Sequence, residues 1–204
     1  RFRKRSKLTN SVRRDYITYS DKGTSVLDWF ENDKMTPETP ILFIVHTCCG
    51  GTREPCTNNI AEAAVNKGWR AVVFNNRGCS GAPITSSRMM SILDLGDLDC
   101  AMQHVKEQFK PTHIFMVGFS LGAYQVTQYA SNRDDITAAA CVSHTYNARK
   151  AEAVLHKFIQ SRLYQPVIMA KLTHFAKKNT YLNNKEAENA KTMGEFDEAI
   201  WCHG

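Results

Sequence analysis

The chain has 204 residues, of which 43% are hydrophobic and 23% are charged, and its formal net charge is +6. These values are typical of one globular domain, or of part of a larger one, and they exclude a disordered or collagen-like chain. No run approaches the ~18 apolar residues of a membrane-spanning helix, and no stretch has the apolar core of a signal peptide.

Positive charge is concentrated at the amino end of the chain. Such a segment can contact anionic lipid or nucleic acid, but it is more often a solvated tail, which is our interpretation of residues 1–14. No aromatic-interleaved basic patch supports nucleic-acid binding. Because the first residue is Arg, we expect native sequence before it, where a membrane anchor could lie. Seven of the 26 basic residues fall in this segment: Arg1, Arg3, Lys4, Arg5, Lys7, Arg13 and Arg14.

The cysteines predict reduced thiols. They are odd in number and include no Cys-x-x-Cys spacing, which favours packed thiols in an intracellular compartment over a disulfide framework or a zinc site. We therefore expect no metal and no cofactor. The seven cysteines are Cys48, Cys49, Cys56, Cys79, Cys100, Cys141 and Cys202.

The predicted elements begin with an antiparallel hairpin. Residues 15–19 alternate like a strand, residues 20–23 (Ser-Asp-Lys-Gly) form a turn, and residues 24–30 return as a second strand. After a proline-containing loop, residues 41–45 (Ile-Leu-Phe-Ile-Val) form a fully buried strand. The Gly-rich stretch at 46–52 is not a P-loop, because no Gly-Lys-Ser/Thr follows it.

Alternating helices and strands follow. This order indicates an α/β fold with a mostly parallel, doubly wound sheet. The expected elements are a helix near 60–65 that stops at Gly68, a strand at 70–75, a helix at about 94–109, strands at 114–117 and 136–142, and between these two a helix at 123–130.

From about residue 146 the chain becomes helical and polar, with helices expected at 151–160, 167–176 and 184–193. We interpret residues 15–145 as the core of the domain and residues 146–204 as a cap or lid over the carboxyl edge of the sheet. An ordinary packed helical subdomain is the alternative, and the sequence does not separate the two.

The stretch Gly118-Phe119-Ser120-Leu121-Gly122 has the spacing of a nucleophile elbow and lies between a predicted strand and a predicted helix. A serine on such a turn takes strained dihedral angles, so the residues two positions away on either side must lack a side chain. The turn exposes the Ser120 hydroxyl and directs the Leu121 N–H at a developing oxyanion.

With the hairpin and His46, this elbow resembles the α/β-hydrolases. Residues 68–81 (Gly-Trp-Arg-Ala-Val-Val-Phe-Asn-Asn-Arg-Gly-Cys-Ser-Gly) and 94–98 (Asp-Leu-Gly-Asp-Leu) narrow the resemblance to the YheT-like branch. That branch includes abhydrolase-domain phospholipases and plant embryogenesis-associated esterases. The resemblance implies a mostly parallel hydrolase sheet with an N-terminal hairpin and a helical lid. It also implies that the last strands of this sheet are absent from these residues.

The resemblance also implies site residues. Ser120 matches the nucleophile, and the N–H of Leu121 with that of Cys48 or of Thr47 matches the oxyanion hole. The family usually has His-Gly where this chain has His46 and Thr47, which leaves the second donor open between two amides. The residues that match bracing positions in loops are Asn76, Arg77, Gly78 and Asp97.

The acid and base of a catalytic triad follow the nucleophile after two further strands in this family. These strands are not among the 204 residues, so we expect the triad Asp and His beyond Gly204 and expect the chain alone to be inactive. Asp134 and Asp135 precede a strand and therefore point away from the active edge. We interpret the remaining candidates as surface or lid histidines: His144, His156, His174 and His203.

Two functions stay open. The first is a serine carboxylesterase or phospholipase that cleaves lipid-like esters through an acyl-enzyme on Ser120. The second is a catalytically inactive hydrolase fold that serves as a binding or scaffold protein. The expected partner is a small ester or lipid and not a nucleic acid, and the oligomeric state stays open.

Overall fold

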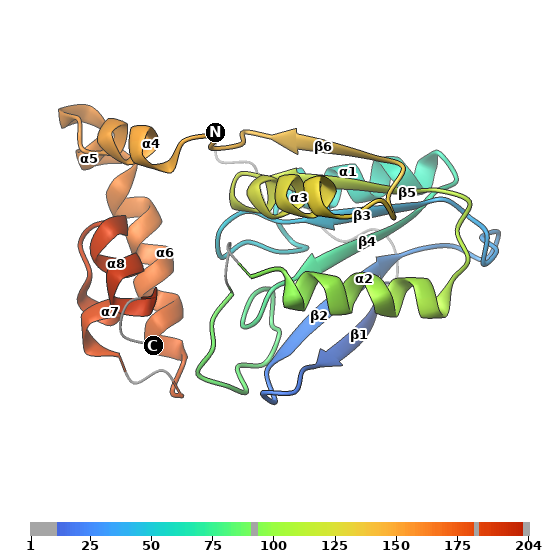
Figure 1. The fold of residues 1–204 in the computed structure, drawn as a ribbon, viewed down its shortest axis with the longest axis horizontal. Helices are drawn as coiled ribbons and strands as arrows, with labels where there is room; N and C mark the ends of the chain where they lie inside the picture. Colours follow the sequence, from blue (N-terminus) through green and yellow to red (C-terminus); the bar gives the residue numbers. More distant parts are fainter. Residues whose placement is uncertain (1–11, 91–93, 182–183, 202–204) are drawn as a thin grey trace.

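The computed structural model describes residues 12–90, 94–181 and 184–201. A six-stranded sheet carries helices on both faces, and a group of helices lies beyond one end of it (Figure 1). Among the described residues, no helix combines the length and the hydropathy needed to cross a bilayer.

The hairpin forms as the sequence predicted, but it begins earlier. β1 (Val12–Thr18) pairs antiparallel with β2 (Thr24–Phe30), which pairs antiparallel with β4 (Arg70–Asn75). The expected start at residue 15 was wrong, because Arg13 and Arg14 belong to β1 and pair with carboxylates across the hairpin. The remaining residues of the expected tail, 1–11, lie outside the described residues.

The sheet has the order β1-β2-β4-β3-β5-β6. Its parallel part joins β4, β3 (Ile41–Val45), β5 (Ile114–Phe119) and β6 (Ala138–Val142). The chain starts these four strands at β3, moves to β4 on one side, and then crosses to β5 and β6 on the other. This is the predicted doubly wound arrangement, and it brings the carboxyl ends of four strands to one edge.

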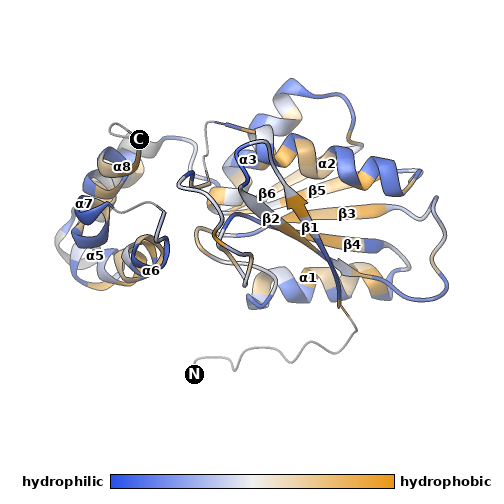
Figure 2. Cartoon of the chain, turned by 90° about the horizontal axis from the view of Figure 1, so that it is seen from below, coloured by the Kyte–Doolittle hydropathy of each residue, from blue (hydrophilic) through white to orange (hydrophobic). Residues whose placement is uncertain are grey.

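Two hydrophobic cores explain why β3 and β4 are buried along their whole length. Side chains alternate between the faces, so Ile41, Phe43 and Val45 pack under α2 (Gly96–Gln108) and α3 (Leu121–Asn132). Leu42 and Ile44 pack against α1 (Pro55–Asn66), which lies on the opposite face of the sheet from α2 and α3 (Figure 2). Each such burial stabilises the fold by about 1.5–3 kcal/mol.

The helical region after β6 differs from the prediction in its divisions. Where three helices were expected, the described residues form α4 (Ala148–Leu155), α5 (Phe158–Leu163), α6 (Gln165–Lys178), α7 (Lys185–Asn189) and α8 (Met193–Trp201). α1 likewise begins at Pro55 instead of near residue 60, because proline suits the first turn of a helix.

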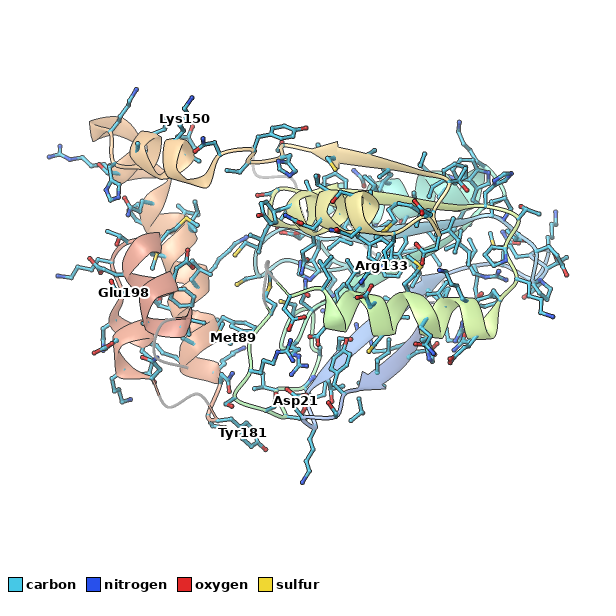
Figure 3. The ribbon with its side chains drawn as sticks, viewed as in Figure 1. Asp21, Met89, Arg133, Lys150, Tyr181 and Glu198 are labelled. Carbon is cyan, nitrogen blue, oxygen red and sulfur yellow. The ribbon has the colours of Figure 1, made fainter. Side chains whose placement is uncertain are left out.

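The helical segment 148–201 shares its core with loops at the carboxyl edge of the sheet. Met169, Phe175 and Phe196 pack with Cys79 and Met89 of the loop that follows β4. Figure 3 shows Met89 at the junction between this segment and the sheet. The position of the helical segment is therefore set by the same loops that surround the end of β5.

Candidate active site

Backbone strain is concentrated at the carboxyl edge of the parallel strands. A non-glycine residue with positive φ costs about 1–3 kcal/mol and persists where the surrounding structure enforces it, often at functional sites. Apart from Lys22 in the hairpin turn, the described non-glycine residues of this kind each follow a different parallel strand: Cys49 (φ 51°) after β3, Ser80 (51°) after β4, Ser120 (53°) after β5 and Ser143 (56°) after β6.

Ser120 lies between the last residue of β5 and the first residue of α3, with φ 53° and ψ −112°. Its N–H donates to the Val142 carbonyl at 2.9 Å, which fixes the turn against the end of β6. The predicted strand–turn–helix conformation is confirmed. As the first residue of α3, Leu121 has an N–H that no carbonyl of its own helix can accept.

Gly118 and Gly122 are sterically required, as their spacing predicted. A Cβ atom on Gly118 would lie 2.3 Å from the Gly122 carbonyl oxygen. A Cβ atom on Gly122 would lie 2.4 Å from the His46 carbonyl oxygen and 2.5 Å from that of Val45. Because these neighbours are backbone atoms, neither position has room for a side chain. The contacts also hold the first turn of α3 against the end of β3.

His46 is fully buried between the loops that follow β3 and β4. Its Nδ1–H donates to the Thr47 carbonyl at 2.5 Å, and its Nε2 accepts the Asn76 N–H at 3.1 Å. These two bonds define a neutral tautomer, and burial lowers the pKa of His46. His46 is therefore a clamp between two loops and does not have the free nitrogen of a general base.

The Thr47 carbonyl is held a second time, by the Gly50 N–H at 3.0 Å. Since the C=O and N–H of a trans peptide point in opposite directions, fixing this carbonyl also fixes the direction of the Cys48 N–H. Within the described residues, no backbone carbonyl accepts the N–H of Cys48 or of Leu121. Both amides remain available to a ligand at this edge.

A buried polar network anchors the far side of the same loop. The Asp28 carboxylate is only 1% exposed and accepts hydrogen bonds from Thr52, Asn75 and Arg14 at 2.5–3.1 Å. Sequence reasoning missed Asp28 and Thr52. The available signal was a carboxylate in the middle of the otherwise apolar run 26–30, because a buried charge requires a partner.

Arg77 braces the loop after β4, as its match to a bracing position implied. It forms a bidentate pair with Asp97 at 2.5 and 2.8 Å and a further ion pair with Asp21 in the hairpin turn. Next to it, Gly78 (φ 70°) leaves room for Phe175 of α6, which would lie 2.6 Å from a Cβ atom at this position.

The histidines do not complete a triad in the described part of the chain. The His144 ring lies between Tyr124 and Tyr146, with centroid distances of 5.7 and 4.1 Å. His174 is exposed on α6, His156 lies between α4 and α5, and His203 lies outside the described residues. No hydrogen bond joins the Ser120 hydroxyl to any histidine or carboxylate that the structure describes.

The acidic and metal-ligating residues give no further centre at this edge. Asp135 pairs with Lys106 and accepts a hydrogen bond from Tyr129 at 2.7 Å, at the opposite end of the sheet, as expected. Within residues 12–90, 94–181 and 184–201, no three His, Cys, Asp or Glu side chains are arranged to hold a metal ion. The six cysteines in these residues are free thiols.

Comparisons with known proteins agree with this geometry. Residues 40–191 match the family described as alpha/beta hydrolase fold. The chain is 30% identical over 207 residues to an abhydrolase domain-containing protein of Dictyostelium discoideum, covering 95% of this chain and 52% of the relative. It is 25% identical to human phospholipase ABHD3, covering 94% and 50%. The chain thus spans about half the length of these relatives.

An esterase from Pyrococcus furiosus has a similar structure, with a TM-score of 0.62 at 16% identity. The similarity covers 83% of this chain and 62% of the esterase chain. At this level of identity the comparison concerns the fold alone.

Proposed function

Because this chain belongs to the α/β-hydrolase family, we propose that it supplies the nucleophile and the oxyanion hole of a serine hydrolase that cleaves carboxylic esters. The observation that carries the proposal is the strained turn at Ser120, with the unpaired Leu121 N–H directly after it. A serine hydroxyl without a role in chemistry would gain nothing from this conformation, which costs about 1–3 kcal/mol.

In the proposed reaction, Ser120 Oγ attacks the ester carbonyl carbon while its proton passes to a histidine base. The carbonyl oxygen becomes an oxyanion that accepts hydrogen bonds from the N–H of Leu121 and of Cys48. We favour Cys48 over Thr47 as the second donor, because the Thr47 carbonyl is held from two sides. The tetrahedral intermediate then releases the alcohol, which takes the proton from the histidine.

Water hydrolyses the resulting acyl-enzyme and releases the carboxylic acid. Since no described histidine is hydrogen-bonded to Ser120, we propose that the base and its acid lie beyond Gly204. Residues 1–204 alone are then expected to lack turnover, because the serine hydroxyl stays protonated and is a weak nucleophile.

We propose lipid-like esters as the substrate class. The name of the human relative, a phospholipase, supports this choice. So does the helical segment 148–201, which packs on the loops around the candidate site through Phe175 and Met169. In this role the segment is a cap that covers the carboxyl edge during the reaction.

A fluorophosphonate probe on the full-length protein tests the proposal, because such probes phosphonylate activated serines. We expect labelling of the wild type, loss of labelling in Ser120→Ala, and full labelling of Ser131→Ala, a control at the other end of α3. Labelling that persists in Ser120→Ala contradicts the assignment of the nucleophile. A folded wild-type protein that does not label indicates the inactive binding or scaffold protein instead.

A further inference from the structure

Thr47 immediately precedes the proposed oxyanion donor, and a carboxylate holds its side chain. The Thr47 hydroxyl lies 2.8 Å from both oxygens of Glu54, to which it donates. Glu54 is the residue before α1, so the position of its side chain is tied to a helix that packs on the sheet. A hydrogen bond to a charged acceptor is about twice as strong as a neutral one.

The loop is shaped around this carboxylate. A Cβ atom on Gly50 would lie 2.1 Å from one Glu54 oxygen and 2.6 Å from the Thr47 hydroxyl. Glycine at position 50 therefore makes room for the bond between Thr47 and Glu54. The Thr47 carbonyl is held by His46 and Gly50, and the Thr47 hydroxyl is held by Glu54. The peptide unit between Thr47 and Cys48 is therefore fixed at its carbonyl and through the Thr47 side chain.

One helix of the segment 148–201 reaches the same carboxylate. Residues four apart lie on one side of a helix, so Lys171 and Phe175 of α6, together with Asn179 directly after the helix, face successive loops of the core. Lys171 Nζ is 4.0 Å from Glu54, and Phe175 contacts the loop at Gly78. Asn179 lines a small cavity with Thr24 and Arg77. α6 thus lies along the carboxyl edge, with Lys171 opposite the loop after β3.

We propose that Glu54 is a positioning residue for the oxyanion hole, acting through the Thr47 hydroxyl, and that Lys171 couples the helical segment to it. This inference rests on the proposed function, because it needs the Cys48 N–H as a donor. Glu54 fixes the Thr47 side chain, and Thr47 in turn fixes the orientation of the peptide unit that it shares with Cys48. Lys171 places a positive charge beside the Glu54 carboxylate only while α6 is docked. Docking of the helical segment therefore favours the loop conformation that stabilises the oxyanion.

The test measures ester hydrolysis and the rate of fluorophosphonate labelling on the full-length protein. Thr47→Val removes the hydroxyl and keeps the side-chain shape. We expect kcat and the labelling rate to fall about tenfold with KM changed less than about twofold, because the donor is misplaced and not lost. Thr47→Ser restores the hydroxyl, and its kcat should lie within about twofold of the wild type.

The coupling to α6 is tested with charge changes. Lys171 is 57% exposed, so we expect Lys171→Met to lower kcat only about twofold. The effect should vanish in the Glu54→Gln background, and Lys171→Arg should restore the wild-type kcat. Lys177→Met, which removes an exposed charge from the last turn of the same helix, is the control and should leave kcat unchanged.

The outcomes separate this inference from the proposed function. If the wild type does not label, the proposed function fails and the inference fails with it. If the wild type labels through Ser120 but Thr47→Val labels at the same rate, only the inference is overturned. Equal losses in Thr47→Val and Thr47→Ser also overturn it, because the hydroxyl is then not the cause. Should Thr47→Val fail to fold, additive effects of Glu54→Gln and Lys171→Met overturn the coupling.

Discussion

The carbonyl oxygen of His46 lies so close to Gly122 that a Cβ atom on Gly122 would be only 2.4 Å from it. The first turn of α3 therefore rests on the end of β3, backbone against backbone. Ser120 and the loop that carries Cys48 follow strands whose first residues, Ile41 and Ile114, are 73 positions apart, yet backbone atoms of the two elements contact each other directly. Close backbone contact consequently fixes the position of the Ser120 turn relative to the loop after β3.

This contact predicts a large penalty for any side chain at position 122. Gly122→Ala should lower the free energy of unfolding by about 2–3 kcal/mol or more, because the new methyl group overlaps two carbonyl oxygens. Urea denaturation measures the effect. Gly68→Ala is the matched control: Gly68 has φ 80° but open space around it, so only backbone strain of about 1 kcal/mol is expected. Equal losses would show that the close contact at Gly122 is unimportant.

The buried carboxylate of Asp28 should contribute more to stability than an exposed one. We expect Asp28→Asn to cost about 2–3 kcal/mol of unfolding free energy, because Arg14 and Thr52 lose a charged acceptor in a buried network. The control is Asp99→Asn, which breaks an exposed pair with Arg133 and should change stability by less than about 0.5 kcal/mol. A loss at Asp28 no larger than that at Asp99 contradicts the anchoring role.

His46 predicts a pH dependence of stability. Its pKa is lowered in the folded protein by burial, so the unfolded chain binds more protons as the pH falls below the ordinary histidine value of about 6.5. Stability from this residue is complete above that pH and declines below it, by at most about 1.4 kcal/mol per pH unit. In urea denaturation between pH 7.5 and 5, His46→Asn should show a shallower decline than the wild type. Parallel declines would contradict this prediction.

Residues 1–204 alone should show little or no turnover of short p-nitrophenyl esters compared with the full-length protein. The reason is that no described histidine is hydrogen-bonded to Ser120, and an oxyanion hole without a base retains at most about 10³–10⁴-fold over water. Turnover that is abolished both by Ser120→Ala and by the change of one histidine to Ala, among His144, His156, His174 and His203, would refute this. The base would then lie inside these residues.

The same chain should associate through β6. This strand forms one edge of the described sheet, and residues 138–140 are exposed. An exposed apolar edge can pair with another chain, and a lysine on it opposes such pairing. We expect concentration-dependent association in size-exclusion chromatography with light scattering, reduced by Ala139→Lys. Ala170→Lys, at an exposed position of α6, should not reduce it, and equal behaviour of both variants would exclude the β6 edge.

The sequence by itself determined the buried strands of the parallel sheet and the elbow. Buried runs such as 41–45 and 70–75 predict strands because both sheet faces are covered. The need for glycine at 118 follows from the local sterics of a strand, a tight turn and a helix, because a Cβ atom there would meet Gly122 and Ala123; the spacing also predicted glycine at 122, although the atoms that exclude a side chain there belong to Val45 and His46. These features depend on neighbours in the chain, so the order of residues is enough to predict them. The start of β1 was mispredicted because Arg13 and Arg14 were counted as tail charges, while their partners lie across the hairpin.

Only the tertiary structure decided how the site is held together. The clamp of His46 on Asn76 joins residues 30 apart, and the contact of Lys171 with Glu54 joins residues 117 positions apart. Such contacts depend on the angle at which loops and helices pack, which no local pattern encodes. The sequence therefore predicted which serine lies on the turn, and only the packing of α3 and α6 shows how the loop after β3 is held beside it.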